Sequence, residues 1–517
     1  MSLLVYNLTA APLVLANGLG TTIPASTAGA GVRGEPWYAS GAELNGRSVP
    51  EYTALQAQQD AGLVAFEWQA FEEYPTYPLL VASAQTDVYG LPFQIYVNAT
   101  TGNDNNPGTA TSPMQTLEAA WKKLPAILTG TDNRVFLSAD NFDISAGLRF
   151  PSVGHGGTGL VVIGTPIDQI GPRVAALAST DTAYVCTVDP VIADGSLEGA
   201  FLRNTSTGDR ITVTGNTTVL GVCTINVLKP GIFVTSGDTF VVERPGSSIR
   251  PPQFGVVAIT EDGGFRDVKI VAQAEAGFGL PLLLFGGFMF FEAVEIDGGT
   301  SGRGVIAPHN SRLVYGLSGP WSADTNPPFS NQRYLANFYL HSAGPFGMYF
   351  ISDDQTSLEI APVLNNVFVG VSNNSNAYIE SIHATLMTMK AEYQSAITIR
   401  QGNVLSDLGF AAGTINAERQ SQLTLGWFGQ SLDISNSIGH GAAGDTMSNV
   451  DTVELTGTGN AGHGLAAANA SLIRTFLGGT LITGAGGDVL VGAVTKAYGA
   501  LPFSEVDGSG PTGNRAQ

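Results

Sequence analysis

Five carboxylic acids of this chain stand in groupings that could perform acid–base chemistry. Glu292, Glu295 and Asp297 lie close together in the segment FEAVEID, and Asp353 and Asp354 are adjacent in ISDDQ. Enzymes that cleave polysaccharides use two carboxyl groups, one as the acid and the other as the base or nucleophile. The sequence therefore offers these five residues as candidate catalytic groups of a glycoside hydrolase or a polysaccharide lyase.

The spacing of Glu295 and Asp297 favours this pair among the candidates. Residues two apart on a strand point to the same face, and two carboxylates in close contact raise the pKa of one of them. A second interpretation stays open, because a chain of net charge −20 also keeps acidic residues in solvent at strand ends and turns. The sequence allows both interpretations and favours solvent-exposed acidic residues over a catalytic pair.

The sequence shows no pattern of metal ligands or of an activated nucleophile. The six histidines are dispersed, without a His-x-x-x-His pair, and no Asp-x-Asp calcium loop occurs. The two cysteines, Cys186 and Cys223, form neither a disulfide framework nor a metal set, and we expect both to be buried as hydrophobic residues. We therefore predict no metal and no cofactor.

Aromatic residues concentrated in the segment 319–354 indicate a different kind of site. Trp321, Tyr334, Tyr339 and Tyr349 stand there among Asn, Gln and Ser residues. Flat rings with hydrogen-bonding neighbours suit sugars, and Tyr or Trp can contact a partner at little entropic cost. These four are candidate glycan-binding residues, unless they fill the protein core or a subunit interface instead.

Composition excludes several functions and permits a large core. The chain has 517 residues, and 43 acidic against 23 basic side chains give a formal net charge of −20, which excludes binding to nucleic acid through a basic surface. Apolar residues make up 44% and charged residues only 13%, which excludes bulk disorder. We expect no membrane insertion, because the longest apolar stretch, residues 276–291, is short and interrupted by Pro281. No Lys or Arg precedes Arg33, so we also expect no secretory leader.

The chain divides into a small N-terminal module and a long body. Residues 1–82 combine short apolar strands, turns and a short helical pattern, and we predict a small β-rich module there. Residues 83–94 are the predicted linker, residues 95–505 the body, and residues 506–517 a flexible C-terminal tail.

The body is predicted to be mainly β. A helix near residues 113–128 carries an apolar stripe that can cover the end of a core, and residues 190–248 form a predicted β insertion. Residues 297–313 and 456–472 share a Gly-x-Gly frame followed by an aliphatic residue, and residues 483–491 repeat it weakly. Short strands with Gly-rich turns bury their apolar faces by stacking as coils. A β-sandwich array is the competing fold, although the Asn-Gly and Asp-Gly hairpin turns that it needs are scarce.

Two segments carry a resemblance to a known family. The run IYVNATTGNDNNPGT followed by SPMQTLEAAWKKL, within residues 95–124, resembles the opening of right-handed parallel β-helix proteins of the phage tailspike and pectate-lyase-like superfamily. Residues 197–245 resemble a β insertion of large phage structural proteins. With the Gly-x-Gly coils, the likeness covers residues 95–500. It implies a right-handed parallel β-helix that follows a small N-terminal anchoring domain.

The resemblance also implies a function. We expect a structural virion protein of a tailed phage, a spike or fibre on the exterior of the particle that takes part in host recognition. Residues 1–82 are expected to bind other virion proteins, three chains to form a homotrimer, and host surface polysaccharide to be a further partner. The alternative is a polysaccharide depolymerase or lyase on the same scaffold. A bacterial surface adhesin ranks lower, because the sequence shows no export signal.

Overall fold

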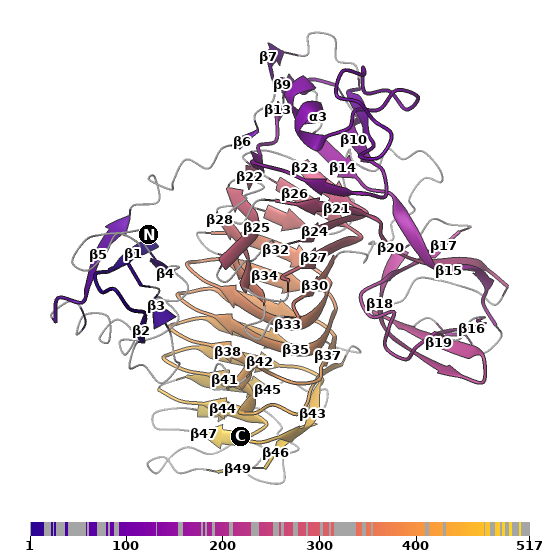
Figure 1. Cartoon of the computed structure of the whole chain (residues 1–517). Coiled ribbons are helices and arrows are strands. Elements are labelled where there is room, and N and C mark those ends of the chain that lie inside the picture. Colours follow the sequence, from indigo (N-terminus) through magenta and orange to yellow (C-terminus); the bar gives the residue numbers. More distant parts are fainter. Residues whose placement is uncertain are drawn as a thin grey trace. The chain divides into compact units, whose positions relative to one another are not determined.

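The computed structural model of the chain is shown in Figure 1. Contacts within the chain divide it into two compact units, Met1–Tyr77 and Pro78–Gln517. The residues that the structure describes are 2–14, 22–23, 25–26, 37–39, 58, 61–69, 79–80, 83–86, 92–130, 132–153, 159–176, 179–180, 183–188, 192–205, 210–228, 237–251, 258–259, 263–271, 278–285, 288–299, 303–309, 312–314, 338–343, 348–352, 355–408, 413–427, 431–469, 471–475, 481–485, 489–491, 496–498 and 506–507.

The first unit contains two small antiparallel sheets. Strand β1 (Ser2–Asn7) lies between β4 (Trp37–Ala39) and β5 (Val64–Gln69), and β2 (Leu13–Val14) pairs with β3 (Thr22–Ile23). The unit ends at Tyr77, so the N-terminal module is shorter than the predicted 1–82.

The second unit begins with short strands that the sequence did not reveal. Strand β6 (Leu79–Leu80) pairs in parallel with β12 (Gly147–Leu148), and β7 (Ser83–Thr86) pairs in parallel with β9 (Pro125–Leu128), which also pairs with β13 (Ser152–Val153). The predicted linker at 83–94 therefore includes a strand of the body. Its residues, Ser-Ala-Gln-Thr, show no apolar alternation from which a strand could be predicted.

Most of the second unit is formed by two large sheets in which every pairing is parallel. The thirteen-stranded sheet contains β8 (Gln94–Val97), β10 (Asn133–Leu137), β14 (Leu160–Ile163), β23 (Gly263–Arg266), β26 (Phe288–Glu292), β29 (Arg312–Val314), β32 (Ser357–Ile360), β34 (Asn376–Ile379), β36 (Ala396–Ile399), β39 (Gln422–Leu425), β42 (Asn449–Thr452), β45 (Leu472–Thr475) and β48 (Lys496–Tyr498). The twenty-stranded sheet contains β11 (Asn141–Asp143), β21 (Ser247–Arg250), β22 (Ala258–Ile259), β24 (Val268–Val271), β25 (Phe278–Phe285), β27 (Val294–Asp297), β28 (Arg303–His309), β30 (Phe338–His341), β31 (Met348–Ser352), β33 (Pro362–Val371), β35 (Ile382–Ala391), β37 (Gly402–Val404), β38 (Gly413–Ala417), β40 (Leu432–Ile434), β41 (His440–Gly444), β43 (Leu455–Asn460), β44 (Leu465–Ala467), β46 (Leu481–Gly484), β47 (Val489–Val491) and β49 (Val506–Asp507).

In most circuits the chain gives one strand to the thirteen-stranded sheet and two to the twenty-stranded sheet, and each strand pairs with one from the next circuit. Asn376 pairs with Ala396, and Gln422 pairs with Asn449. Strands this far apart in sequence, paired in parallel, are incompatible with the antiparallel sandwich that was the competing fold. Figure 1 shows the strands stacked one above another through the orange and yellow part of the chain. The prediction of a mainly β fold is confirmed, and its two large sheets are parallel.

The second unit has one large apolar core within the parallel sheets and a separate one in the insertion, and aromatic rings form a column in the first. Neighbouring rings in the column have centroids 5.1 to 6.3 Å apart. Burying each ring contributes about 1.5–3 kcal/mol. A Cβ at Gly263 would lie 2.5 Å from the Phe150 ring, so this strand position needs glycine. In order, the column consists of Trp121, Phe150, Phe265, Phe291, Phe338 and Phe350.

A second column is made of serines. Each serine lies at the corner directly before one of the strands β34, β36, β39, β42 and β45. The backbone N–H of each of the first four serines donates to the hydroxyl of the serine in the next circuit, at 3.1 to 3.3 Å. All members are buried. Since a buried N–H without an acceptor is costly, each hydroxyl replaces the partner that a sheet would supply. The column, named the serine ladder below, consists of Ser375, Ser395, Ser421, Ser448 and Ser471.

One α-helix lies among the described residues. Helix α3 (Leu117–Lys123) begins at its N-cap Thr116, whose hydroxyl accepts the Ala119 N–H at 3.1 Å, and its buried residues Leu117, Ala120 and Trp121 face the core. It is shorter than the predicted 113–128, because residues 125–128 form β9. No helix among the described residues is long and apolar enough to cross a membrane.

An antiparallel six-stranded sheet is inserted between β14 and β21. It contains β15 (Pro166–Val174), β16 (Ala183–Thr187), β17 (Phe201–Asn204), β18 (Arg210–Val219), β19 (Val222–Val227) and β20 (Thr239–Pro245). The insertion begins at β15, well before the predicted residue 190. The sequence did not predict this strand, because its residues are mostly exposed and mixed in polarity. Its two edge strands are joined where the Ala176 N–H donates to the Val185 carbonyl. Cys186 and Cys223 lie directly opposite each other and are buried, as predicted.

Candidate functional site

The parallel register brings four ionisable residues together from three strands. On β24, β27 and β30, Lys269 pairs with Glu295, and Asp297 pairs with His341. Between the two acids lies Ile296, which is fully buried in the core. Glu295 and Asp297 therefore point to the opposite face of the sheet, as the spacing of two predicted.

The side chains of these residues form a compact cluster of ion pairs. Lys269 Nζ lies 2.8 Å from Glu295 Oε1 and 3.0 Å from Asp297 Oδ2. His341 Nε2 lies 2.9 Å from the same Glu295 oxygen. Arg244, from the insertion, lies 3.5 Å from Glu295 Oε2. The buried carboxylate of Glu295 is thus surrounded by basic groups, and we call these five residues the Glu295 cluster.

These neighbours decide the protonation state of Glu295. Burial by itself raises the pKa of a carboxyl group, but the His341 hydrogen bond and the Lys269 ammonium outweigh burial and lower the pKa of Glu295 to about 2. The expectation that proximity to Asp297 raises the pKa of one of the two acids is therefore wrong for Glu295. A carboxyl group with this pKa is ionised at neutral pH and has no proton to donate as a general acid.

Three members of the cluster are residue types that bind metals. Ligand atoms of Glu295, Asp297 and His341 lie within 4.8 Å of one another. The Lys269 ammonium, however, already contacts both carboxylates, and a metal ion would have to displace that charge. The donor set therefore suits an internal ion-pair cluster better than a metal centre.

Glu292 belongs to a different network from Glu295. The backbone turns between them at Ala293, which has a φ of +52°, so that Glu292 ends a strand of the thirteen-stranded sheet. Its carboxylate lies 3.5 Å from Arg266 and 3.9 Å from Arg210 of the insertion. Arg210 also contacts Asp267 at 2.6 Å. This network joins the insertion to the parallel sheets.

Tyr339 is buried beneath the insertion rather than exposed to a ligand. Only 7% of its surface is accessible, and its ring stacks on His341 with centroids 4.5 Å apart. A Cβ at Gly199 of the insertion would lie 2.2 Å from the ring. The prediction of Tyr339 as a glycan-binding residue is therefore corrected to a packing role, the alternative that the sequence left open.

Most of the remaining predicted residues lie outside the part of the chain that the structure describes. Asp353, Asp354, Trp321 and Tyr334 lie outside the described residues. Tyr349 is placed by its backbone within β31, where it pairs with Val305 and Phe368.

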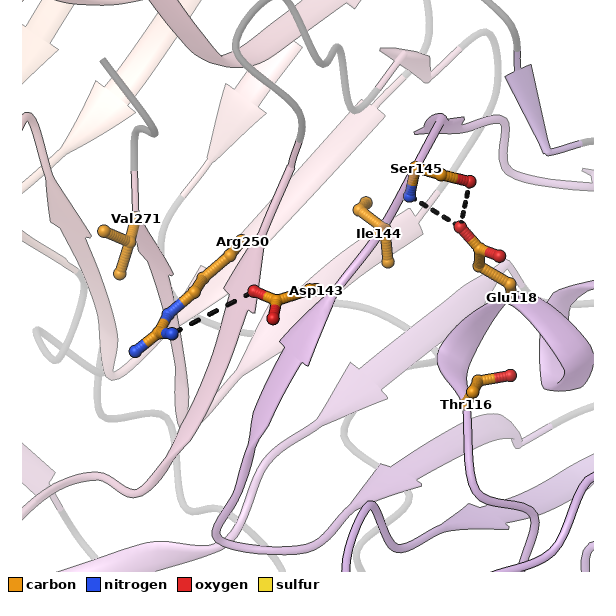
Figure 2. Close-up of a pocket in the computed structure, with 7 residues that line it drawn as sticks. All are labelled: Thr116, Glu118, Asp143, Ile144, Ser145, Arg250 and Val271. Carbon is orange, nitrogen blue, oxygen red and sulfur yellow. Dashed lines mark hydrogen bonds and ion pairs between the residues drawn. The ribbon is translucent and has the colours of Figure 1, made fainter. Parts of the chain in front are cut away.

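A pocket of about 760 Å³ adjoins strand β24, which also carries Lys269 of the Glu295 cluster. Figure 2 shows Asp143 and Arg250 pointing toward each other, with 4.0 Å between their charged atoms, and Glu118 accepting a hydrogen bond from the Ser145 N–H at 2.6 Å. Val271, which lines the pocket, pairs with Asp297. The lining consists of Thr116, Glu118, Asp143, Ile144, Ser145, Arg250 and Val271.

A second group of carboxylates was not recognised in the sequence. Glu392, Glu418 and Asp445 directly follow β35, β38 and β41 on successive circuits, and Lys390 Nζ lies 2.7 Å from Glu392 and 3.1 Å from Glu418. Burial raises the pKa of Glu418, and repulsion from Glu392 and Asp445 adds to this effect against the attraction of Lys390. A recurring sequence pattern could have revealed this group: AEYQS, AERQS and GDTMS occur at residues 391–395, 417–421 and 444–448.

Comparisons with known proteins give structural neighbours but no family. No family model matches the chain, and no curated protein matches it. Among solved structures, the Gp54 tailspike of Acinetobacter baumannii bacteriophage AP22, in complex with capsular saccharide, is 8% identical with a TM-score of 0.22, and the match covers 72% of each chain. The tailspike gp61 of Pseudomonas phage phi297 is 10% identical with a TM-score of 0.24 and 74% of each chain covered. A glycoside hydrolase is 8% identical with a TM-score of 0.21, covering 73% of this chain and 96% of its own. Likenesses this weak carry no argument about function.

Proposed function

We propose that the strands of the two parallel sheets close into a right-handed parallel β-helix. In this proposal the protein is a spike or fibre on the exterior of a tailed phage particle, where it adheres to a surface polysaccharide of the host. Two features support this proposal. The chain passes between two parallel sheets circuit after circuit, which is the strand order that a β-helix requires. The segments within residues 95–124 and 197–245 resemble phage β-helix proteins.

The observation that favours adhesion over catalysis is the pairing of the candidate carboxylates. Glu295 and Asp297 share the Lys269 ammonium, and Glu292 lies beside Arg266. Glu295, with a pKa of about 2, supplies no general acid, whereas glycoside hydrolysis needs one carboxyl group that stays protonated. Fixed charged groups beside an open pocket can still hold sugar hydroxyls by hydrogen bonds.

Incubation of the purified protein with host capsule or lipopolysaccharide tests this function. We expect saturable binding without release of reducing ends or unsaturated uronates, and the double variant Glu295→Ala, Asp297→Ala should leave that chemical outcome unchanged. Release of sugar by the native protein would refute adhesion without cleavage. Absence of binding to every host polysaccharide would refute the recognition role.

A polysaccharide depolymerase is the second candidate, and one observation favours it. Burial raises the pKa of Glu418, which lies next to Glu392 and Asp445, and glycosidases use two neighbouring carboxyl groups. If the protein cleaves glycan there, Glu418→Gln should reduce the rate by about 10²–10⁴-fold, the usual contribution of a general acid. Asp168→Asn, at an exposed position on β15 of the insertion, is the control and should retain the native rate.

Two assembly roles belong to the same proposal. The first unit, Met1–Tyr77, is proposed to bind other virion proteins, and three chains are proposed to associate as a homotrimer. Deleting residues 1–77 should abolish incorporation into particles, and normal incorporation of the shortened chain would refute the anchoring role. Sedimentation equilibrium of the full chain tests the trimer, which a monomeric mass would exclude.

A further inference from the structure

Two cysteines of the insertion occupy directly opposite positions on neighbouring strands. Cys186 on β16 pairs with Cys223 on β19 in antiparallel register. They are the two cysteines of the chain, and both are free thiols in this structure. The sequence predicts only that both are buried, whereas their placement across one pair of strands permits a covalent bond between them.

The register fixes the distance between the two backbones. The Val188 N–H donates to the Gly221 carbonyl at 2.9 Å, two positions further along the same two segments. Because hydrogen-bonded pairs recur at every second residue of an antiparallel ladder, Cys186 and Cys223 also form such a pair, in which Cα atoms lie about 5.5 Å apart. Disulfides span Cα distances of about 4.4–6.8 Å, most often about 5.5–6 Å. The backbone can therefore accept the bond without moving apart or together.

Both thiols point to the same side of the sheet. Cys186 and Cys223 are buried in the apolar core of the insertion, together with Tyr184 and Ile225, which pair with each other two positions away. Side chains alternate between the faces of a strand, so this shared burial places the two sulfur atoms on one face. Burial, with the Cys223 thiol close by, raises the pKa of Cys186 to about 11.

We propose that Cys186 and Cys223 are a redox modification site, a thiol pair that oxidises to an internal disulfide across β16 and β19. The oxidant is a small disulfide such as oxidised glutathione. One cysteine thiolate attacks a sulfur of this oxidant, forms a mixed disulfide and releases one glutathione thiolate. The other cysteine thiolate then attacks the protein sulfur of the mixed disulfide and releases the second glutathione. The protein loses two protons and two electrons, and the oxidant is reduced to two thiols.

The oxidant reaches the buried sulfurs through the edge of the sheet. Strand β16 is the last in the strand order of the insertion, beside β19. On its other side Val185 accepts a hydrogen bond from the Ala176 N–H at 2.9 Å and donates one to the Ser179 hydroxyl at 3.0 Å. Local opening at a sheet edge needs less free energy than unfolding of the whole protein. We therefore expect oxidation to be slow in buffer and faster in urea below the unfolding transition.

The bond would fasten the part of the insertion that covers the parallel sheets. It closes a segment that contains β17 and β18, and these strands carry Arg210, which is paired with Asp267 of the parallel sheets. Closing a long segment restricts the unfolded chain and stabilises the folded one. The chemistry does not depend on the proposed function. A chain that acts outside the cell would acquire the bond after it leaves the reducing interior.

Thiol counting on the full chain tests the pair. The reduced protein is incubated with oxidised glutathione, in buffer and in urea below the unfolding transition, and is then denatured and treated with Ellman's reagent. We expect both thiols to be lost, the intact mass to fall by two hydrogen atoms, and peptide mapping to link β16 to β19. Dithiothreitol should restore both thiols. The matched controls are Cys186→Ala and Cys223→Ala, each of which should end as an adduct with one glutathione.

The urea unfolding midpoint of the insertion gives a second readout. Oxidation of the native chain should raise this midpoint and slow amide hydrogen exchange in β16. The double variant Cys186→Ala, Cys223→Ala should fold and show no response to glutathione, because both groups that react have been removed.

Four outcomes would overturn the inference. Both thiols could survive in urea although hydrogen exchange shows that β16 opens. Two glutathione molecules could remain attached to one chain, or the cysteines could link two chains instead of two strands. An oxidised chain with a lower midpoint than the reduced one would show that the bond distorts the strands. None of these results bears on polysaccharide binding, so the proposed function stands or fails separately.

Discussion

Glu295 remains ionised although it is almost fully buried, because basic side chains from two other strands and from the insertion surround it. Lys269, His341 and Arg244 all lie within 3.5 Å of its carboxylate oxygens. An acid held in this way contributes to stability only while it is charged. The cluster should therefore link the stability of the second unit to acid pH.

The first prediction concerns this pH dependence. Because the folded-state pKa of Glu295 is about 2 and its ordinary value is 4.5, the unfolded chain binds the proton first as the pH falls. The stabilisation is complete above pH 4.5 and is lost between pH 4.5 and 2, for a total of about 3 kcal/mol. Urea unfolding midpoints of the native chain and Glu295→Gln should differ most near pH 6 and converge toward pH 2. Asp143→Asn, at a largely exposed position, should show a much smaller change over this range.

The second prediction concerns the hairpin turn between β18 and β19. Val219 pairs with Val222, so the turn is Leu220-Gly221, with φ values of +51° and +77°. Two positive φ values define a turn in which Asn-Gly is favoured, yet the leucine is 99% exposed and gains nothing from packing. Leu220→Asn should stabilise the hairpin by about 0.5–1 kcal/mol and slow amide hydrogen exchange in β18 and β19. Val219→Asn, at a neighbouring exposed position on the strand, is the control and should not slow exchange.

Only those features of the Glu295 cluster that depend on residues within one strand could be predicted from the sequence. The spacing of Glu295 and Asp297 predicted a shared face, and this local inference is correct. Lys269 and His341 become neighbours only through strand register with earlier and later circuits. The turn lengths that set this register, unlike the alternation within a strand, leave no fixed period in the sequence, so the sign of the pKa shift could not be predicted.

At the scale of elements, the ladder serines and the turns before them mark successive circuits of the chain better than the Gly-x-Gly frames do. Residues before the ladder serines adopt positive φ, among them Asn373, Asn374, Tyr393 and Gln394. Asparagine tolerates positive φ, and Asn373 and Asn374 adopt it, whereas Asn376 lies in strand β34. The Gly-x-Gly frames do mark real equivalents, since they precede or begin β28, β44 and β47 of one sheet. The serines were missed because intervals of 20, 26, 27 and 23 residues conceal their recurrence.

The third prediction tests the serine ladder. Ser421→Ala removes the acceptor of the Ser395 N–H and leaves that buried donor unsatisfied, at a cost of about 1–3 kcal/mol. Hydrogen exchange at Ser395 and in β36 and β39 should accelerate, and the urea midpoint should fall. Ser421→Thr keeps the hydroxyl and should retain most of the protection. Thr424→Ala, on the strand that follows Ser421 and half-buried, should have little effect; equal losses in the two alanine variants would contradict the ladder's role.

At the scale of the whole molecule, the boundary between the two units decides where the chain can be cut. Tyr77 and Pro78 separate the units, and the next strand, β6, already pairs with β12, whose Leu148 is fully buried. The sequence placed this boundary at 82 because β6 has only two residues, too few for any periodicity. A cut at 82 therefore removes a strand of the second unit, whereas a cut at 77 removes none.

A pair of truncations that differ by five residues tests this boundary. A chain of residues 78–517 keeps β6 and should unfold in urea at the midpoint of the main transition of the full chain. A chain of residues 83–517 leaves the backbone of Gly147 and Leu148 unpaired on one side, so its midpoint should be lower and amide exchange at Leu148 faster. Equal midpoints for both truncations would show that β6 contributes nothing. A lower midpoint for 78–517 than for the full chain would show that the first unit stabilises the second, and the two units would then not be energetically independent.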